Sequence, residues 1–464
     1  MKTTKYLLAA VYAIVIAASC SRFGSSRIDA SLPASVKDGV ITLKTPARAP
    51  GQVSAIGLAA DPIDTVRIGF IGLGMRGDDA VRRSTFIEGT KATALCDLYP
   101  DRVARMQDFL ASKGLPEAAA YDGEDGWKAL CERDDVDLVY ICTDWKHHTP
   151  MAVYAMEHGK HVVVEVPAAM SIKECWALVD ASERTRRHCM MLENCVYDFF
   201  EVTVLEMAKA GLFGDIYHVE GAYIHNLNPF WHEYADNWRL LYNAEFRGDN
   251  YPTHGIGPLC QVLGIHRKDL MDYVVSMDTD SFNGKKLAKE NLGTEEFANG
   301  DHTVSLIRTL EGRQIEIQHN VYAARPYSRM YQLTGTEGFA NKYPTKGIAI
   351  KAESAGERIE GVNYDKLDGE RFVPKEVYDA LMEQYKPDYV RDIEKKAREV
   401  GGHGGMDFIM DSRLIHCLRN GLPLDMDVYD AAEWSCLTEL SRISIENGSA
   451  PVRVPDFTRG DWKK

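Results

Sequence analysis

The sequence predicts an α/β protein in which a doubly wound parallel sheet comes first and an antiparallel sheet with helices follows. Three observations predict this fold class. Apolar strand-type runs alternate with helical segments from Val66 to about residue 195. The first of these runs, Val66–Ile71, leads directly into a glycine motif. After about residue 196, several strand-type runs follow one another across short turns, a pattern typical of antiparallel pairing.

The glycine motif consists of Gly72, Gly74 and Gly77. In a dinucleotide-binding turn, the first glycine permits a tight turn, the second lets the backbone approach a pyrophosphate, and the third lets the next helix pack close to the strand. The pyrophosphate would lie at the N-terminus of that helix. A second strand-type run, Ala92–Cys96, ends in Asp97, placed 20 residues after Gly77 to accept hydrogen bonds from an adenosine ribose. A glycine-rich loop of some other α/β protein is the alternative.

The other elements of the parallel sheet continue the alternation. The run from Val136 to Cys142 is almost continuously apolar, as in a strand that is buried on both faces. In chain order we expect helix Gly77–Glu88, a helix that begins at Pro100, helix Trp127–Arg133, strand Val136–Cys142, helix Pro150–Glu157, strand His161–Glu165, helix Ser171–Thr185 and strand His188–Leu192.

The second half of the chain has a different pattern. We expect a helix at Tyr197–Ala210 and further helices within residues 375–400 and 406–446. Between them lie strands Ile216–Tyr223, Tyr273–Asp278, His302–Leu310, Arg313–Asn320 and Met330–Thr334. The resulting division of the chain is a signal peptide at 1–20, an arm at 21–64, a nucleotide-binding domain at 65–195 and a C-terminal substrate and oligomerisation domain at 196–464.

The first twenty residues are typical of a signal peptide. Two lysines precede an apolar segment, Tyr6–Ile16, that is too short for an ordinary membrane span. The small residues Ala17–Ser19 then lead to Cys20, which resembles a bacterial lipoprotein site. We expect export in a Gram-negative-type bacterium, as a periplasmic protein or one held at the membrane by a lipid on Cys20. Ordinary cleavage nearby is the alternative, and residues 21–64 are interpreted as a tether or arm.

Charge and cysteine usage narrow the classes of partner. The formal net charge is −14 without a basic cluster, which disfavours nucleic acid as a partner. The nine cysteines after Cys20 include no CxxC pair. We therefore expect buried free thiols and no structural zinc site.

Further motifs carry a resemblance. Ile141–Thr143 is followed by a His-His pair, and the segment Gly159–Pro167 reads Gly-Lys-His-Val-Val-Val-Glu-Val-Pro. With the glycine motif and Asp97, these blocks resemble the glucose–fructose oxidoreductase/inositol dehydrogenase family (Gfo/Idh/MocA). The resemblance implies an N-terminal Rossmann domain and a C-terminal α+β domain with a large open, mostly antiparallel sheet that shapes a sugar site. It also implies a homo-oligomer, because an open sheet face often pairs in this fold.

The triplet Glu165-Val166-Pro167 departs from that family. Its dehydrogenases carry Glu-Lys-Pro with the lysine near the reacting carbon, and valine can neither donate nor accept a proton. A subgroup with Glu-Val-Pro, glycoside hydrolase family 109, resembles this chain in several further blocks. They are Gly74–Gly77, Asp144–His148, Glu193-Asn194, Trp238–Leu240, Tyr251–Gly255 and Arg325–Arg329.

The resemblance to family 109 implies an NAD-dependent α-N-acetylgalactosaminidase acting on a glycan or glycoside. In that chemistry NAD⁺ takes a hydride from C3, a base removes the acidified C2 proton, and the aglycone leaves from C1. Water then adds and the hydride returns, so tightly bound NAD is regenerated in each turnover. Two alternatives are a periplasmic NAD(P)-dependent sugar oxidoreductase of the Gfo/Idh/MocA family and a non-catalytic sugar-binding lipoprotein.

The resemblance assigns the cofactor contacts to the ends of the parallel strands, where open α/β sheets bind ligands. The acidity of Asp97 favours NAD over NADP. Three assignments have plain alternatives: Arg76 as a solvated charge at a helix start, and Asp97 and Asn194 as turn residues. Two adjacent histidines point in different directions, so we expect at most one of them to be catalytic and no metal pair. The implied cofactor residues are Gly72, Gly74, Met75, Arg76, Gly77, Asp97, Trp145, Lys146, His147, His148, Glu165, Val166 and Asn194.

The resemblance places the sugar site in the second domain. It implies His254 as the catalytic base, since imidazole has a suitable pKa, and Tyr251 as an acid or sugar contact. We expect Pro252 and Gly255 to keep this segment non-helical. Without the resemblance, His254 would be a structural histidine. The implied substrate contacts are Tyr223, Arg239, Tyr251, Pro252, Thr253, His254 and Tyr327.

Two assignments in this domain stay open. Tyr331 is a rival for the role of Tyr327, and Tyr223 is otherwise an ordinary aromatic strand residue. The loop Gly401–Gly405, with His403 at its centre, could border the site but has no assigned role.

Overall fold

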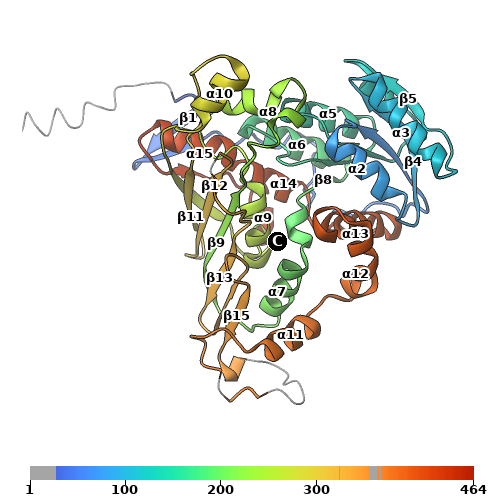
Figure 1. The fold of residues 1–464 in the computed structure, drawn as a ribbon. Coiled ribbons are helices and arrows are strands. Elements are labelled where there is room, and N and C mark those ends of the chain that lie inside the picture. Colours follow the sequence, from blue (N-terminus) through green and yellow to red (C-terminus); the bar gives the residue numbers. More distant parts are fainter. Residues whose placement is uncertain (1–27, 323, 355–362, 366) are drawn as a thin grey trace, which may run out of the picture.

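The computed structural model describes residues 28–322, 324–354, 363–365 and 367–464. Within them the chain forms two sheets with helices between and around them (Figure 1). The predicted signal peptide and Cys20 lie outside the described residues. In the ranges that are described, no helix is long and apolar enough to cross a membrane.

The first sheet has six strands, all parallel, and confirms the predicted doubly wound fold. Its strands in spatial order are β5 (Ala119–Asp122), β4 (Thr90–Asp97), β3 (Val66–Ile71), β6 (Leu138–Ile141), β7 (His161–Val164) and β8 (Cys189–Met191). The chain runs outward from β3 to β5 and then returns to β6 on the other side of β3. The strand order therefore reverses between β3 and β6, and ligands bind at the carboxyl ends of strands at such a point.

Helices cover both faces of this sheet, which explains why β6 and β7 are buried along their whole length. The helices are α2 (Met75–Ser84), α3 (Pro100–Ser112), α4 (Gly126–Cys131), α5 (Trp145–Glu157) and α6 (Ile172–Thr185).

Helix α5 begins five residues before the predicted start at Pro150. The carboxylate of Asp144 accepts a hydrogen bond from the backbone N–H of Lys146 at 3.0 Å and so caps the helix. Pro150 lies inside the helix rather than at its start. The residues from Trp145 to His148 are consequently helical, and successive side chains leave the helix in different directions.

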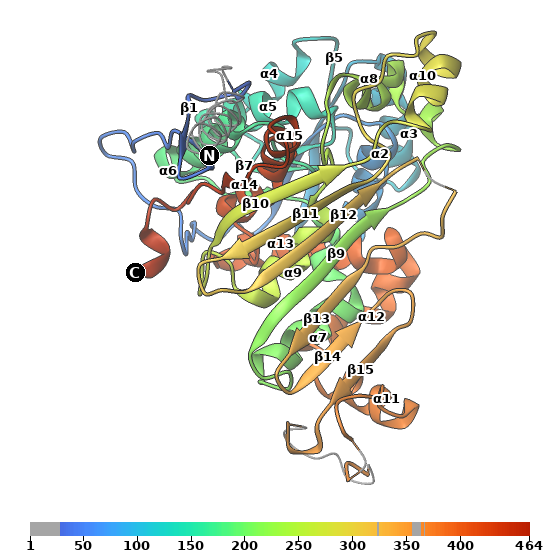
Figure 2. The same cartoon turned by 90° about the vertical axis from the view of Figure 1, so that its left-hand side faces the viewer.

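The second sheet has ten strands, and only the β12–β9 and β16–β2 pairs are parallel. This confirms a mostly antiparallel sheet. Figure 2 shows one of its faces with no helix in front of it, while helices such as α9 and α15 pack behind. In spatial order the strands are β1 (Ala34–Lys37), β2 (Val40–Leu43), β16 (Val452–Arg453), β10 (Met271–Asp278), β11 (Thr303–Thr309), β12 (Gln314–Asn320), β9 (Ile216–Ile224), β13 (Tyr331–Gly335), β14 (Gly338–Asn341) and β15 (Gly347–Ile350).

The C-terminal helices join the two sheets. Helix α14 packs against both α6 and β8 of the first sheet and against α9 of the second. The stretch 375–400 is divided at Pro387, which directly precedes α12. The helices of this half are α7 (Phe199–Lys209), α8 (Trp238–Glu245), α9 (Thr253–Leu263), α10 (Gly284–Leu292), α11 (Lys375–Gln384), α12 (Asp388–Val400), α13 (Met406–Asn420), α14 (Val428–Ser435) and α15 (Leu437–Glu446).

The described part of the arm runs over both halves. Its strands β1 and β2 extend one edge of the ten-stranded sheet. Farther along, Arg48 forms ion pairs with Glu183 of α6 at 2.8 Å and with Asp461 near the C-terminus at 2.7 Å. The nine cysteines after Cys20 are free thiols, and all except the partly exposed Cys142 are buried, as predicted.

Candidate active site

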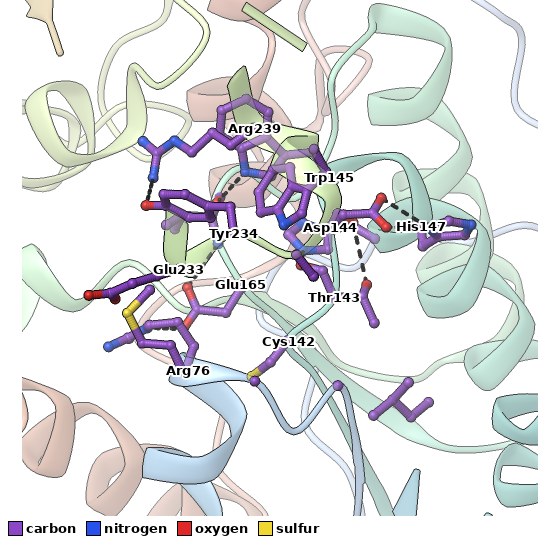
Figure 3. A pocket seen from close by; sticks show the side chains of 18 of the residues that line it. Arg76, Cys142, Thr143, Asp144, Trp145, His147, Glu165, Glu233, Tyr234 and Arg239 are labelled. Atoms are coloured by element: carbon purple, nitrogen blue, oxygen red, sulfur yellow. Dashed lines mark hydrogen bonds and ion pairs between the residues drawn. The ribbon is translucent and has the colours of Figure 1, made fainter. Parts of the chain in front are cut away.

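A cavity of about 1340 Å³ is lined by residues from both halves of the chain. A typical pocket for a drug-sized ligand has roughly 300–1000 Å³, so this cavity has room for more than one such ligand. It extends from the carboxyl ends of β3, β4, β6 and β7 to strand β9 and the start of α9. Figure 3 shows Arg76, Trp145, Glu165 and Arg239 in its wall.

The glycine motif forms one end of the cavity. Gly72 has a φ of +85°, and a Cβ atom there would lie 2.5 Å from the carbonyl oxygen of Cys142. A Cβ atom on Gly77 would lie 1.8 Å from the carbonyl oxygen of Gly72. Gly74 precedes α2 without a side-chain cap, so backbone N–H groups of the first turn are free for a ligand. Gly72, Gly74, Met75 and Arg76 line the cavity, whereas Gly77 packs behind them.

Asp97 lies at the end of β4, 4% exposed, and also lines the cavity. One of its oxygens accepts a hydrogen bond from the backbone N–H of Leu73 at 2.6 Å, and the other accepts one from Tyr99 at 2.9 Å. The predicted turn role and the predicted ribose role are therefore compatible, because a carboxylate oxygen can accept more than one hydrogen bond. The glycine turn, the free helix start and this carboxylate together fit a dinucleotide.

Arg76 is not a solvated charge. Its Nε atom donates to Glu165 at 2.7 Å, and its Nη1 atom donates to Asp407 of α13 at 3.0 Å. Asn194, at the end of the last parallel strand, donates to the other oxygen of Asp407 at 2.6 Å. Burial alone would raise the pKa of Asp407, but Arg76 and the neighbouring His403 and Arg83 hold it well below its usual range.

In the first turn of α5, which follows β6, Trp145 and His148 are buried whereas Lys146 and His147 are exposed. The indole of Trp145 is buried and donates to the carbonyl of Val166 at 3.2 Å. His148 is buried, with its Nδ1 atom 2.7 Å from the carbonyl oxygen of Pro167, and burial lowers its pKa. His147 is exposed at the cavity wall, where it pairs with Asp144 at 2.8 Å. Lys146 is exposed and is not among the described residues that line the cavity.

Tyr223, Arg239, Tyr251 and His254 meet at the other end of the cavity. The Tyr223 and Tyr251 ring centroids are 4.9 Å apart, and the Arg239 guanidinium lies 4.4 Å from the Tyr251 centroid. Arg239 also donates to the hydroxyl of Tyr234 at 2.7 Å. A cation held against aromatic faces in this way keeps a fixed orientation.

The remaining predicted substrate residues separate into two groups. Tyr327 is 37% exposed and lines the cavity, whereas its rival Tyr331 is 2% exposed and is not among the described lining residues. Pro252 and Thr253 are buried, and they too are absent from the described lining set. The geometry therefore favours Tyr327 over Tyr331.

The prediction that Pro252 and Gly255 keep their segment non-helical is wrong. Helix α9 begins at Thr253, directly after Pro252, so His254 lies in its first turn. Proline suits a helix start because its fixed φ is already helical. Gly255 serves packing: a Cβ atom there would lie 3.2 Å from the backbone nitrogen of Ala222, and one on Gly221 would lie 2.2 Å from the carbonyl oxygen of Gly255, so α9 and β9 approach at backbone distance.

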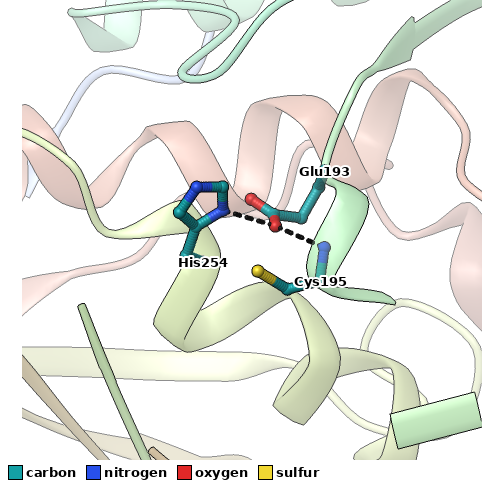
Figure 4. A group of neighbouring side chains, drawn as sticks. All are labelled: Glu193, Cys195 and His254. Atoms are coloured by element: carbon teal, nitrogen blue, oxygen red, sulfur yellow. Dashed lines mark hydrogen bonds and ion pairs between the residues drawn. The ribbon is translucent and has the colours of Figure 1, made fainter. Parts of the chain in front are cut away.

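His254 has a buried carboxylate partner. Its Nδ1 atom lies 2.7 Å from an oxygen of Glu193, which is 0% exposed (Figure 4). Burial lowers the pKa of His254, although Glu193 opposes that shift, so the imidazole is neutral near pH 7. The carboxylate fixes the tautomer, with the proton on Nδ1 and Nε2 free to accept one.

Sequence reasoning identified Glu193 only as part of a matching block and gave it no role. Its distance of 61 residues from His254 left no local signal for the pair. Other lining residues without a predicted role include His225, Tyr234 and Arg329. His403, which had no assigned role, also lines the cavity.

Among the residues that the structure describes, two clusters have side-chain atoms close enough together to hold a metal ion. Glu193, Cys195 and His254 form one, and His266, Asp430 and Glu433 form the other. In the first, Glu193 and His254 are already paired, and burial raises the pKa of the Cys195 thiol well above its usual value. A protonated thiol is a poor metal ligand, so this donor set suits proton transfer better.

Two protein-family models match the chain. Residues 197–464 match the C-terminal domain of glycosyl hydrolase 109, and residues 66–193 match the NAD-binding Rossmann fold of an oxidoreductase family. The chain belongs to glycosyl hydrolase family 109. It is therefore a glycosidase of that family that carries an NAD-binding Rossmann domain, as the sequence motifs indicated.

Curated relatives agree along almost the whole chain. A glycosyl hydrolase family 109 protein of Phocaeicola vulgatus is 56% identical over 452 residues, which cover 97% of this chain and 96% of that protein. Another of Porphyromonas gingivalis is 59% identical over 427 residues, 91% of each chain.

Solved structures share the fold at low identity. Levoglucosan dehydrogenase in complex with NADH and levoglucosan has a TM-score of 0.61 at 16% identity, over 84% of this chain and 99% of that one. The WlbA dehydrogenase of Bordetella pertussis, in complex with NADH and UDP-GlcNAcA, has a TM-score of 0.59 at 16% identity, over 85% and 99%. This likeness supports the two-domain fold alone.

Alanine substitutions in the glycine motif should separate folding from cofactor binding. We expect Gly72→Ala to destabilise the protein by more than about 1 kcal/mol, because φ is positive there and the new Cβ meets Cys142. Gly74→Ala has its nearest contact at 3.5 Å, so the melting temperature should not change while NAD affinity falls at least about tenfold. Thermal melts and NAD titrations check both. Unchanged NAD affinity in Gly74→Ala would contradict the placement of the pyrophosphate.

Glu193→Gln tests the orientation of His254. Since a base works above its pKa and the carboxylate raises the His254 pKa, we expect the acid limb of the kcat/KM–pH profile to move to lower pH. The rate at the plateau should fall about 100-fold. Glu201→Gln is the control, because Glu201 is equally buried but pairs with Lys342 instead. A profile that does not move in Glu193→Gln would show that His254 is not the titrating base.

Proposed function

We propose that this family 109 enzyme hydrolyses terminal α-N-acetylgalactosaminides and uses tightly held NAD that is regenerated in each turnover. The observation that carries the proposal is the shared cavity, in which a neutral, carboxylate-oriented histidine, His254, accompanies the glycine motif. The side chain at the position of the dehydrogenase lysine is Val166, which lines the cavity and cannot transfer a proton. The substrate class follows from the family resemblance.

Gly72, Gly74 and Asp97 would hold NAD, which would supply reversible hydride transfer at C3. The protein's own residues handle protons and position. Nε2 of His254 would accept the proton from the C3 hydroxyl or C2, because Nδ1 is occupied by Glu193. Arg239, Tyr223 and Tyr251 would hold the sugar. Their contacts with one another fix the orientation of the three side chains and would thereby fix the orientation of the bound sugar.

Departure of the aglycone needs a proton on its oxygen, and a second histidine is available for that step. His403 lines the same cavity, and its Nδ1 atom lies 2.9 Å from the buried carboxylate of Asp407. That bond leaves Nε2 to carry a proton. We assign the base to His254 and the acid to His403, since two carboxylate-oriented histidines match the two proton transfers.

Retention of NAD is supported by a segment that closes one side of the cavity. Residues 233–236 line the cavity between β9 and α8. From this segment, Asp236 accepts a hydrogen bond at 2.9 Å from the hydroxyl of Tyr99, which follows Asp97 in the Rossmann domain. The contact joins the two halves across the cavity that we assign to the dinucleotide.

Export to the periplasm and a lipid at Cys20 belong to the same proposal, on the evidence of the N-terminal sequence. A periplasmic enzyme has no free NAD pool to draw on, so a regenerated cofactor suits that compartment. We also propose a homo-oligomer that pairs through the open face of the ten-stranded sheet (Figure 2). Met277 and Leu306, 66% and 40% exposed, lie on adjacent strands of that face.

The test is a panel of α- and β-linked aryl N-acetylgalactosaminides, with bound nicotinamide measured in the same samples. We expect bound NAD, turnover without net NADH, and deuterium at C2 of product formed in heavy water. His254→Ala should lower kcat about 100-fold or more while the NAD content stays the same. Absence of nicotinamide would contradict the mechanism, and net NADH formation would favour the oxidoreductase alternative.

Tyr99→Phe tests retention. Loss of one hydrogen bond of about 0.5–1.5 kcal/mol should speed NAD dissociation about 2- to 10-fold, without a change in melting temperature. The readout is NAD release, followed by nicotinamide fluorescence after rapid dilution of the reduced holoenzyme. Tyr121→Phe is the matched control, because that hydroxyl bonds to Arg133 away from the cavity. Equal rates of NAD release in the two variants would show that the Tyr99–Asp236 hydrogen bond does not retain NAD.

A further inference from the structure

The Gly401–Gly405 loop has an unusual backbone. The φ angles of its five residues are +84°, +79°, +46°, +77° and +111°, all in the region that favours glycine. Four of these residues are glycines and accept such angles freely. His403 is the exception, and a non-glycine residue in this region costs of order 1–3 kcal/mol. A specific interaction must therefore hold His403 in place.

That interaction is with Asp407 in the first turn of α13. Asp407 is 0% exposed, and its Oδ2 atom lies 2.9 Å from Nδ1 of His403. The loop wraps closely around this carboxylate, because a Cβ atom on Gly402 would lie 2.8 Å from Cβ of Asp407. The glycine-rich loop is thus the backbone path that brings a histidine of the C-terminal domain onto this buried acid.

The same carboxylate binds two residues of the Rossmann domain. Its Oδ2 atom accepts from Arg76 at 3.0 Å, and its Oδ1 atom accepts from Asn194 at 2.6 Å. Arg76 lies in the first turn of α2, the helix of the glycine motif, and Asn194 follows the last parallel strand. Both lie in the wall of the cavity assigned to the dinucleotide. One buried acid therefore contacts both the cofactor region and the histidine.

We propose that Asp407 is a positioning residue that directs Nε2 of His403 toward the aglycone oxygen and links that orientation to the dinucleotide-binding loop through Arg76. The inference rests on the proposed glycosidase function, in which His403 protonates the leaving oxygen. Without Asp407, the strained loop loses the bond that fixes the imidazole, and the proton donor is no longer held at the cavity.

Asp411, one helical turn further along α13, provides a matched control. It is also buried, and its carboxylate accepts from Nε of Arg83 and from the hydroxyl of Tyr140, each at 3.0 Å. It contacts neither His403 nor Arg76 among the hydrogen bonds of the described residues. Asp411→Asn therefore removes a buried negative charge from the same helix without removing the proposed positioning contact.

The experiment compares a good and a poor leaving group in the holoenzyme. A nitrophenol leaves without much protonation, whereas a methoxide needs an acid. We expect Asp407→Asn to lower kcat/KM about 100-fold or more for methyl α-N-acetylgalactosaminide but less than about 10-fold for the nitrophenyl glycoside. His403→Asn should show the same selectivity, since asparagine tolerates a positive φ. The double variant should be no worse than His403→Asn alone, because both substitutions remove one function.

Each outcome has a distinct meaning. Equal losses on both glycosides, or additive losses in the double variant, would overturn the proposal, as would the same selectivity in Asp411→Asn. If Asp407→Asn loses bound NAD but lowers kcat/KM equally for the two glycosides, Asp407 would act only through Arg76, and the proposal that it positions His403 would be wrong. Asp407→Glu, which keeps the charge but moves it, serves if the asparagine variant does not fold, and it should show the same selectivity. A wild-type enzyme that cleaves neither glycoside would instead contradict the proposed function.

Discussion

The contact between Arg76 and Asp407 is the interaction on which the site depends. Arg76 lies between Glu165 of its own domain and Asp407 of the C-terminal domain, and Asp407 is fully shielded from water. Charges removed from water are stable only when each has a partner, and loss of one member leaves the other uncompensated. This ion pair therefore joins the two halves of the cavity, in addition to the partners that each residue has in its own half.

The two histidines of the cavity follow one principle. Each has a buried carboxylate at Nδ1, Glu193 for His254 and Asp407 for His403, which leaves Nε2 for the role in proton transfer that we propose. The difference lies in how the backbone places them. His254 is in the first turn of a regular helix, whereas His403 is in a loop of glycines with positive φ. His254 is fixed by its helix, whereas the position of His403 depends on its hydrogen bond to Asp407.

Val166 stands where the related dehydrogenases have a lysine, and this difference bears on which residues can transfer protons. A lysine there would place a proton donor beside the reacting carbon, but Val166 presents only methyl groups and accepts the Trp145 indole N–H at its carbonyl. In the mechanism that we propose, proton transfer therefore comes from the C-terminal half. The cavity is accordingly divided, with dinucleotide-binding features from the Rossmann domain and both carboxylate-oriented histidines, His254 and His403, on the other domain.

Local sequence patterns were sufficient to predict most of the parallel sheet and the dinucleotide-binding loop. Apolar runs predicted five strands of the parallel sheet, β3, β4, β6, β7 and β8, because strands buried on both faces must be apolar. The edge strand β5 is partly exposed and has no such run. The glycine spacing and Asp97 predicted the dinucleotide loop, since those residues meet backbone requirements that lie within one turn. Helix starts were less predictable: α5 and α9 begin beside Asp144 and Pro252, where capping and packing against β9 outweighed the local signals.

Only the tertiary structure decided which side chains work together. Glu193 and His254 are 61 residues apart, and Arg76 and Asp407 are 331 apart, so no spacing along the chain announces either pair. Lys146 and His147 are adjacent in sequence, yet only His147 lines the cavity, because successive helical residues point in different directions. The sequence by itself determined the fold class and the cofactor loop, which depend on local backbone conformation. The pairing of His254 with Glu193 and of His403 with Asp407, to which we assign proton transfer, was decided by burial and tertiary contact.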